Sequence, residues 1–411
     1  PFVSKGRYTT QIIEHGYIET ECSVAKPEEG GVEILSQGQG VYEDRKQIAK
    51  VLNLPEEKVR VILVPNGGGF GGKEDLSVQH HAALCAFLLD KPVKVKLNRD
   101  ESVRMHPKRH PLIMDYTLAC DKDGMLTAIK ADIIGDTGAY ASVGMKVLER
   151  AAGHATGAYS IPNADIVSKA VYTNNIPCGA MRGFGVNQVT FAIENCIDDL
   201  CEQGGFDRWQ FRYNNALVDG GVASTGQILK GGTGVRETLL AVKDQFYNAN
   251  YAGIACGIKN TGIGNGMPDD GVVKIEIVSK NKVILNHGWT EMGQGVNTMA
   301  VQFLCNETGI DPSIIEVKVD TKINATAGMT TASRATSIVG NAIIEASKKL
   351  KEDLENSDLS ELSGRIYEGK WICDWTTKPG ATDKDIITHY SYSYATQVVI
   401  LDDNGEIEKV I

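Results

Sequence analysis

The chain has 411 residues, of which 42% are hydrophobic, and carries a formal net charge of −10 at pH 7. This length predicts two or three domains of roughly 100–200 residues each, with ample apolar material for their cores. The acidic balance and the lack of a basic run exclude the electrostatic footprint of a nucleic-acid-binding protein. No apolar stretch approaches the roughly 20 residues that a membrane-spanning helix needs. Neither nucleic acid nor a membrane is therefore expected as a partner.

The nine cysteines are scattered along the chain, and none stands in a CxxC pair. Several, such as Cys85, sit in apolar contexts where cysteine behaves as a small hydrophobic residue. This usage predicts free thiols in a reducing, cytoplasmic compartment. Because the ligand spacings of structural zinc and iron–sulfur sites are missing, no protein metal site is predicted.

The first half of the chain alternates strand-like runs with helical patterns. Runs of β-branched and aromatic residues predict strands, and apolar residues at helical spacing predict helices. Strands are expected at 8–13, 17–25, 32–36, 59–64, 93–97, 114–119 and 127–134, and helices at 43–54, 75–89, 186–203 and 208–216.

The second half begins with a shift in composition towards glycine, around 219–221 and 231–232. We take this shift as the junction between two domains, 1–218 and 219–411. Because helices and strands interleave throughout, the fold class is predicted as α+β. Beyond the junction, strands are expected at 272–278 and 282–287, and helices at 235–245, 296–307 and 337–354.

The most informative stretch is the loop 67–74, which reads Gly-Gly-Gly-Phe-Gly-Gly-Lys-Glu. It lies between a strand and a helical pattern, so its backbone amides are expected to bind a phosphate or another anionic group. Its spacing fits a dinucleotide fingerprint and, up to Lys73, a phosphate loop. Glu74 stands where a phosphate loop needs Ser or Thr for magnesium. A protein that binds ATP or NAD through Gly67–Lys73, and a plain structural loop, remain as alternatives.

Three further loops also precede predicted helices. Residues 290–295 read Thr-Glu-Met-Gly-Gln-Gly and offer unblocked backbone donors together with a side-chain amide. Residues 181–185 read Met-Arg-Gly-Phe-Gly, and the arginine can extend towards a phosphate or a carbonyl. Residues 329–334 place small hydroxyls before the long helix, where capping of the helix is the ordinary explanation. Together the four loops suggest one extended anionic ligand that lies between two domains. Composition and spacing do not identify this ligand.

The histidines give no metal site at this level. The adjacent His80 and His81 are expected to point in different directions from a helix, so that both cannot face one ion. His106 and His110 lie in a proline-rich loop and are assigned no catalytic role. No Gly-x-Ser-x-Gly element and no Cys–His arrangement indicates nucleophilic catalysis.

Taken together, the loops at 67–74, 181–185 and 291–295 resemble those of the molybdopterin-binding subunit of molybdenum hydroxylases, the xanthine dehydrogenase and aldehyde oxidase family. The resemblance runs from about residue 15 to the C-terminus. It is closest to purine-type bacterial enzymes, including those called selenium-dependent xanthine dehydrogenases. It implies two mixed α/β molybdenum-cofactor-binding domains with the cofactor between them, and an oligomer in which electrons pass to iron–sulfur and FAD subunits.

The resemblance also implies which residues contact the cofactor. Gln39 matches the glutamine that hydrogen-bonds an oxygen ligand of molybdenum. In this family the metal is held by the dithiolene sulfurs of the pterin, so no protein ligand is implied. The dinucleotide form of the pterin is left open, with the cytosine form as one candidate. The remaining positions matched to the cofactor are Phe70, Gly71, Arg182, Gly293, Gln294, Ala332 and Ser333.

Three positions bear on the substrate. Glu74 matches the carboxylate that hydrogen-bonds a purine ring, and Arg150 matches the arginine that stabilises charge on the heterocycle. Phe184 matches the aromatic side chain that stacks on the ring. An acid and a base across a flat pocket would polarise an electron-poor ring towards attack. The resemblance therefore implies oxidative hydroxylation of an aza-aromatic, purine-like ring carbon rather than oxidation of a simple aldehyde.

The sequence departs from the family pattern in two respects. No aromatic residue stands near Ile263, where animal enzymes carry the second ring of the substrate sandwich. The chain also ends at Ile411, before the segment with the catalytic glutamate of the family, and lacks the usual upstream domain. We therefore expect an internal fragment or one subunit of a split enzyme, with 1–218 and 219–411 each incomplete. A cofactor-free, inactive fragment remains an alternative.

Overall fold

The computed structural model describes residues 1–382 and 385–411, which fold into two compact units. Unit 1 contains Pro1–Ile13, Lys108–Met267 and Trp375–Ile411, and unit 2 contains Glu14–Pro107 and Pro268–Asp374. Each unit thus takes residues from both sides of the composition shift near 219. The domains 1–218 and 219–411 do not coincide with these units and stay a prediction about the sequence.

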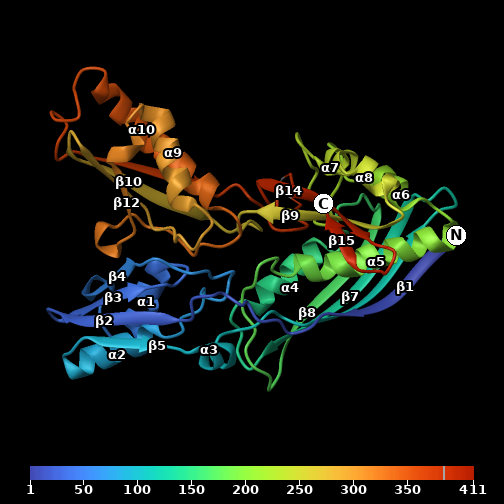
Figure 1. Cartoon of the computed structure of the whole chain (residues 1–411), viewed down its shortest axis with the longest axis horizontal. Coiled ribbons are helices and arrows are strands. Elements are labelled where there is room, and N and C mark those ends of the chain that lie inside the picture. The colour runs from blue at the N-terminus through green and yellow to red at the C-terminus, as the bar shows by residue number, and fades with distance from the viewer. Residues whose placement is uncertain (383–384) are drawn as a thin grey trace. The chain divides into compact units, whose positions relative to one another are not determined.

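Unit 1 is built around an α/β layer whose sheet has the strand order β1-β6-β7-β8. Its strands alternate buried and exposed side chains, as expected for a sheet with one covered face. Helix α5 packs on β1 and β6, and α4 packs on β7 and β8 (Figure 1). The bounds are β1 (Phe2–Thr9), β6 (Leu112–Cys120), β7 (Leu126–Gly138), α4 (Gly144–Gly153), β8 (Asn163–Tyr172) and α5 (Val186–Gly204).

The rest of unit 1 is a second, three-stranded antiparallel sheet in the order β15-β14-β9, with short helices beside it. Strand β14 pairs with β9 over its whole length, from Ser391 opposite Thr261 to Leu401 opposite Tyr251. Buried side chains of both sheets belong to one continuous core. The bounds are α6 (Arg208–Asn215), α7 (Val235–Ala241), α8 (Lys243–Asn248), β9 (Tyr251–Thr261), β14 (Ser391–Leu401) and β15 (Ile407–Val410).

Unit 2 contains two four-stranded sheets, and the first has the order β4-β3-β2-β5. Strands β3 and β4 are parallel, and the crossover between them is α1, which packs on β4. Helix α2 packs on β2, β3 and β5. The bounds are β2 (Cys22–Glu28), β3 (Gly31–Ser36), α1 (Val41–Leu52), β4 (Val59–Leu63), α2 (Gln79–Leu89), β5 (Val93–Lys96) and α3 (Arg99–Met105).

The second sheet of unit 2 has the order β12-β11-β10-β13. Helix α10 packs on β10 and β13 and against α9, and its buried positions recur at helical spacing, as in Ile338, Ala342 and Ile343. The bounds are β10 (Asp269–Ser279), β11 (Lys282–Asn286), α9 (Val296–Thr308), β12 (Ile315–Lys318), α10 (Ala335–Leu354) and β13 (Ile366–Cys373). Among the described residues, no helix combines the length and the apolar composition needed to cross a bilayer.

Several predicted elements have different bounds in the structure. The expected strands 8–13 and 17–25 are replaced by β1, which ends at Thr9, and β2, which begins at Cys22. The expected helix 235–245 is divided at Val242 into α7 and α8. Helix α4, which carries Arg150, was not predicted. Most of these differences arise in short segments, where periodicity carries little information.

Candidate functional site

The glycine-rich loop of unit 2 has a left-handed backbone at a non-glycine residue. Phe70 has φ 53°, and the neighbouring Gly68 and Gly71 have φ 103° and 102°. Glycine adopts such angles at little cost, whereas a bulky residue such as phenylalanine is strained there. The Phe70 side chain is 43% exposed, so burial of that ring does not explain the strain.

The expectation that this loop leads directly into a helix is wrong. Helix α2 begins at Gln79 rather than near Glu74. The side-chain oxygen of Gln79 accepts hydrogen bonds from the amides of Ser77 (3.0 Å) and Val78 (3.1 Å). These two residues precede α2, whose first helical residue is Gln79, so the glycine loop and the helix start are separated by a turn. The loop 67–74 must bind any ligand through its own backbone.

Gln39 holds this loop in place. Its Oε1 accepts hydrogen bonds from the amides of Gly71 (2.9 Å) and Lys73 (3.3 Å), and its Nε2 donates to the carbonyl of Thr330 (3.1 Å). Its backbone pairs with the same two segments, from Gln39 N to Lys73 O (2.9 Å) and from Thr330 N to Gln39 O (2.7 Å). The residue is 2% exposed. Gln39 therefore fastens the glycine loop to Thr330, which is 291 residues away from Gln39 in the chain.

Lys73 does not extend into a phosphate site. Its ammonium donates to the carbonyl of Glu19 (3.0 Å) and to Asn66 Oδ1 (2.9 Å), and it lies over the ring of Tyr17 at 4.6 Å. Burial lowers the pKa of Lys73 to about 8. The phosphate-loop interpretation needs this lysine to reach a phosphate, and the observed contacts hold it inside unit 2.

The loop 290–295 adjoins the glycine loop, because a side chain at Gly69 would meet Met292 Sδ. The expectation of unblocked donors here is wrong. The carboxylate of Glu291 accepts hydrogen bonds from the amides of Gly293 (2.8 Å), Gly295 (3.0 Å) and Asn297 (3.1 Å). A carboxylate at the start of α9 is favoured by the helix dipole. Gly293 nevertheless has φ 108° and faces open space among the described residues.

Gln294 also folds back on its own loop. Its Oε1 accepts from the amide of Met292 (2.8 Å), and its Nε2 donates to the carbonyl of Thr290 (2.7 Å). The amide of Thr290 in turn donates to the hydroxyl of Thr330 (2.8 Å). The loops 290–295 and 329–334 are therefore directly linked.

The loop 329–334 repeats the backbone signature of the glycine loop. Ala332 and Ser333 have φ 57° and 52°, in the left-handed region. Arg334 is buried, forms an ion pair with Asp269, and donates to the carbonyl of Met329 (2.7 Å). Its guanidinium also lies 4.9 Å from the ring centre of Trp289. Arg334 thus locks this loop, a role that was not assigned to it from the sequence.

Unit 1 carries a second Gly-Phe-Gly turn, in which Phe184 has φ 52°. Gly185 is the N-cap of α5, with φ 92°. The carbonyl of Arg182 accepts a hydrogen bond from Arg109 Nη2 (2.7 Å), while the Arg182 side chain is exposed. A buried arginine thus fixes the backbone of the predicted contact residue.

Left-handed backbone concentrates at the predicted cofactor and substrate positions. Across residues 1–382 and 385–411, nine non-glycine residues have positive φ, and four of them are predicted site residues. Strained residues of this kind persist when the surroundings over-determine them, and they cluster at ligand sites. The four are Phe70, Phe184, Ala332 and Ser333.

Glu74 lies in unit 2 with 8% of its surface exposed. Burial raises the pKa of Glu74 to about 7, against smaller opposing effects of the Thr331 side chain and the Arg334 charge. At neutral pH this carboxyl group is therefore present in both protonation states. Such a group can donate a proton to a ring nitrogen or accept one from it.

Arg150 lies on α4 in unit 1 and lines a cavity of about 480 Å³. Its guanidinium donates to His389 Nε2 and to the carbonyl of Ile263 (2.9 Å). Burial lowers the pKa of Arg150 to about 10, so the side chain remains charged at neutral pH. His154 and Asn265 line the same cavity. Polar side chains and the Arg150 cation thus line one pocket.

His389 could not be found from the sequence, because it is 239 residues away from Arg150 in the chain. Burial, followed by the nearby Arg150 charge, lowers the pKa of His389 to about 2. The ring is therefore neutral, and its Nε2 accepts from Arg150. The sequence has no aromatic residue near Ile263, but the fold places one there, because the ring of Tyr390 packs against Gly262.

The structure brings eight of the predicted site residues into unit 2 and places three in unit 1. Within unit 2, hydrogen bonds from Gln39 and Thr290 connect the three loops. The residues of unit 2 are Gln39, Phe70, Gly71, Glu74, Gly293, Gln294, Ala332 and Ser333, and those of unit 1 are Arg150, Arg182 and Phe184.

Two models of known protein families match this chain. A family model described as a molybdopterin cofactor-binding domain matches residues 1–216. The chain belongs to the molybdopterin cofactor-binding family. A second model with the same description matches residues 243–399. The resemblance drawn from the loops and the α+β class with two mixed α/β domains are thereby confirmed.

Curated relatives include a probable xanthine dehydrogenase subunit of Bacillus subtilis, 36% identical over 379 residues. That match covers 89% of this chain and 50% of the relative. The nicotinate dehydrogenase large molybdopterin subunit of Eubacterium barkeri is 41% identical over 244 residues, covering 59% of this chain and 57% of the relative. The chain thus spans about half the length of these two curated relatives.

Among solved structures, the aldehyde oxidoreductase of Desulfovibrio gigas has a TM-score of 0.89 at 24% identity. This match covers 100% of the chain and 48% of that structure. Quinoline 2-oxidoreductase of Pseudomonas putida has a TM-score of 0.84 at 20% identity, covering 100% of this chain and 60% of that one. At sequence identities this low, the similarity to these two structures shows a shared fold and nothing more.

Within the described part of the chain, the loops of unit 2 leave open space and unpartnered polar atoms that a bound cofactor would fill. Gly293 faces open space although its φ of 108° demands glycine, so packing within the described residues gives no reason for that backbone. Two buried side-chain atoms beside the loops, Gln37 Oε1 and Thr290 Oγ1, have no hydrogen-bond partner among the described residues. Buried polar atoms normally have a partner, and a bound ligand would supply one.

Proposed function

We propose that this chain is the molybdopterin-binding part of an oxidoreductase that hydroxylates a ring carbon of a purine-type aza-aromatic substrate. In this reaction a ring C–H and water yield a C–OH group, two protons and two electrons. The electrons would leave through iron–sulfur and FAD subunits. The observation that carries the proposal is the Gln39 bridge, which fixes the glycine loop and the loop 329–334.

The cofactor would be held by backbone more than by side-chain charge. The loops of unit 2 offer backbone with positive φ for this purpose. In the glycine loop and the loop 290–295 it belongs to Phe70, Gly71 and Gly293, and in the loop 329–334 to Ala332 and Ser333. Arg182 in unit 1 is a further proposed contact, and so is Gln294, whose side chain also braces its own loop. When bound, the molybdenum cofactor supplies two-electron redox chemistry at a metal held by its own dithiolene sulfurs. No protein metal ligand is required for this role.

Glu74 would recognise the heterocycle through a shared proton. With a pKa of about 7, its carboxyl group is protonated in acid solution and donates to a ring nitrogen. As pH rises through about 7, the group becomes an acceptor only. A substrate whose ring nitrogen must receive a hydrogen bond would then bind less well.

Arg150 would stabilise negative charge that develops on the heterocycle. Its cation is oriented by the neutral His389 and by the carbonyl of Ile263, so little reorganisation is needed when charge appears. Preorganised cations of this kind contribute most in a dry environment. Phe184 would stack on the ring.

A second candidate substrate is a pyridine carboxylate. The relative named nicotinate dehydrogenase is 41% identical, above the 36% of the xanthine dehydrogenase relative. The cavity beside Arg150 also contains His154 and His389, and Lys259 lies close enough to lower the pKa of His389. At neutral pH both histidines are neutral, so Arg150 is the charged group that lines this cavity, and its cation would suit an anionic ring substituent.

The first test is metal analysis of the intact complex purified from its native source, followed by turnover with xanthine, hypoxanthine, nicotinate and an aromatic aldehyde. We expect molybdenum in the complex and the highest kcat/KM with a purine. Nicotinate as the best substrate would select the second candidate. A complex without molybdenum, or one that binds ATP or NAD stoichiometrically at the glycine loop, would overturn the proposal.

Two variants test the residue roles. Arg150→Met should lower turnover on the order of 100-fold while molybdenum content is retained. An equal loss of turnover and molybdenum would contradict its role towards substrate. Glu74→Val should weaken purine turnover and spare aldehyde turnover, and unchanged selectivity would remove Glu74 from the pocket.

A further inference from the structure

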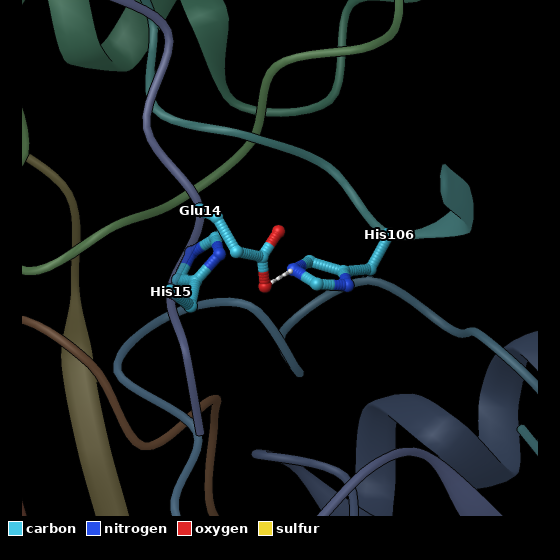
Figure 2. Close-up of side chains that lie close together, drawn as sticks. All are labelled: Glu14, His15 and His106. Carbon is cyan, nitrogen blue, oxygen red and sulfur yellow. Dashed lines mark ion pairs between the residues drawn. The ribbon is translucent and has the colours of Figure 1, made fainter. Parts of the chain in front are cut away.

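A cluster of metal-ligand side chains lies in unit 2, apart from the residues assigned to the cofactor. Glu14, His15 and His106 each place one ligand atom so that all three atoms lie within 4.8 Å of one another. Figure 2 shows the Glu14 carboxylate reaching towards the His106 ring, with the His15 ring beside it. Both histidines are buried, and the Glu14 side chain is 27% exposed.

The orientation of His106 is fixed from its far side. Its Nδ1 lies 2.6 Å from the carbonyl of Ser102 and 3.1 Å from Glu21 Oε1. Nδ1 is therefore the donor on this side of the ring, and Nε2 lies 2.9 Å from Glu14 Oε1, where a metal ion would take the place of a proton between the two atoms. Glu21 is itself held by the hydroxyl of Tyr17. A histidine bound to metal usually has such a carboxylate or carbonyl behind its other nitrogen.

We propose that Glu14, His15 and His106 form a binding site for a divalent transition-metal ion, with zinc as the preferred ion. Two imidazole nitrogens and one carboxylate oxygen make a common three-residue set for zinc, with a fourth position left for water. Imidazole-rich sets disfavour magnesium and calcium, which take oxygen ligands. The partly exposed Glu14 leaves a route for the ion from solvent.

The site lies against the glycine loop. A side chain at Gly72 would approach His15 Cγ to 2.9 Å and Tyr17 Cε1 to 2.9 Å, so the His15 ring packs directly on the loop backbone. A metal ion that fixes His15 would therefore also brace residues 71–73. The expected consequence is structural: binding of zinc stabilises unit 2 without contacting substrate.

The competing explanation is a buried ion pair between His106 and Glu14 that needs no metal. The full chain separates the two possibilities. After treatment with a chelator, it is dialysed against a zinc-buffered solution, and retained zinc is measured by mass spectrometry. We expect one zinc per chain and an increase in Tm on zinc addition. Cobalt substitution should give the visible absorption of a low-coordinate N/O site.

Variants locate the ion. Glu14→Gln and His15→Gln should each abolish retained zinc and the zinc-dependent rise in Tm, while circular dichroism shows a folded chain. The matched control is the His80→Gln, His81→Gln double variant, because those rings lie only 4.0 Å apart on α2 and could bind zinc adventitiously. It should retain one zinc. No retained zinc in the wild type, or loss of zinc only in the double control, would overturn the proposal.

Discussion

The two Gly-Phe-Gly turns have nearly the same backbone and different supports. Phe70 and Phe184 have φ 53° and 52°, and the glycines that follow have φ 102° and 92°. In both turns the residue after the second glycine donates to the carbonyl of the first, at 2.8 Å from Gly72 and 3.1 Å from Val186. Local sequence thus sets the same turn twice.

What surrounds the two turns differs. The turn of unit 2 is held by Gln39, which comes from another segment, and by the buried Lys73 of the loop itself. The turn of unit 1 is held by close backbone packing, since a side chain on Gly185 would lie 2.4 Å from the carbonyl of Val147. The glycines therefore specify the shape of the turn. The groups packed around the turn decide which substitutions it tolerates.

The largest effect is expected for Gly185→Ala. The added methyl group meets the Val147 carbonyl, and alanine is strained at φ 92°. Together these should lower the free energy of unfolding by about 4 kcal/mol. Urea unfolding of the full chain measures this loss of stability.

The matched control is Gly293→Ala. Its φ is 108°, but no atom lies within 4 Å of the added methyl group, so the free energy of unfolding should fall by only about 1–2 kcal/mol. Equal losses would contradict the distinction.

Gln39→Ala should have the next largest effect. It leaves two amides and one carbonyl of buried loops without their partner, which costs about 3 kcal/mol in the free energy of unfolding. Cofactor content of the purified complex should fall with it. Retention of the cofactor with full stability would show that the turn of unit 2 needs no distant support.

Glu74 should make unit 2 sensitive to pH. Because burial raises its folded pKa from 4.5 to about 7, the folded state binds more protons than the unfolded state between these values. The free energy of unfolding should therefore fall by about 2 kcal/mol as pH rises from 4.5 to 7. Glu74→Gln, which removes the titrating group and nearly keeps its shape, should reduce this slope in urea unfolding at several pH values. An unchanged slope would contradict the raised pKa.

Lys73 should have the smallest effect, with the opposite sign. Burial lowers its pKa from 10.5 to about 8, so the unfolded state binds more protons between pH 8 and 10.5. Stability should rise by at most about 2 kcal/mol over that interval, and by less to the extent that water screens the ammonium group. Lys73→Met should remove the rise, as measured by urea unfolding across the same interval. If stability still rises over this interval in the variant, another titrating group causes the rise.

Long periodic segments were predictable from the sequence. Helix α10 was expected at 337–354 and spans Ala335–Leu354, because its apolar positions recur over about five turns. Helix α4 and strand β9 were not predicted, since their patterns are short or interrupted. The loops around 67–74, 182–185 and 291–295 could be identified as candidates because glycine marks backbone that other residues rarely adopt.

Their hydrogen bonds could not be predicted. Nothing local shows that Glu291 occupies the amides of Gly293 and Gly295, or that His389 orients Arg150. Such contacts depend on which distant segments fold together. The same holds for the cluster that joins the adjacent Glu14 and His15 to His106, which lies far along the chain.

The sequence by itself determined the family, the α+β class and the turns in which glycine permits a left-handed backbone. These properties depend on residue type and short-range spacing. Tertiary structure decided which amides are occupied, which carboxyl group is buried enough to hold its proton at neutral pH, and which histidines meet. Desolvation and hydrogen-bond partners come from residues that lie far away in the chain, so no local pattern records them.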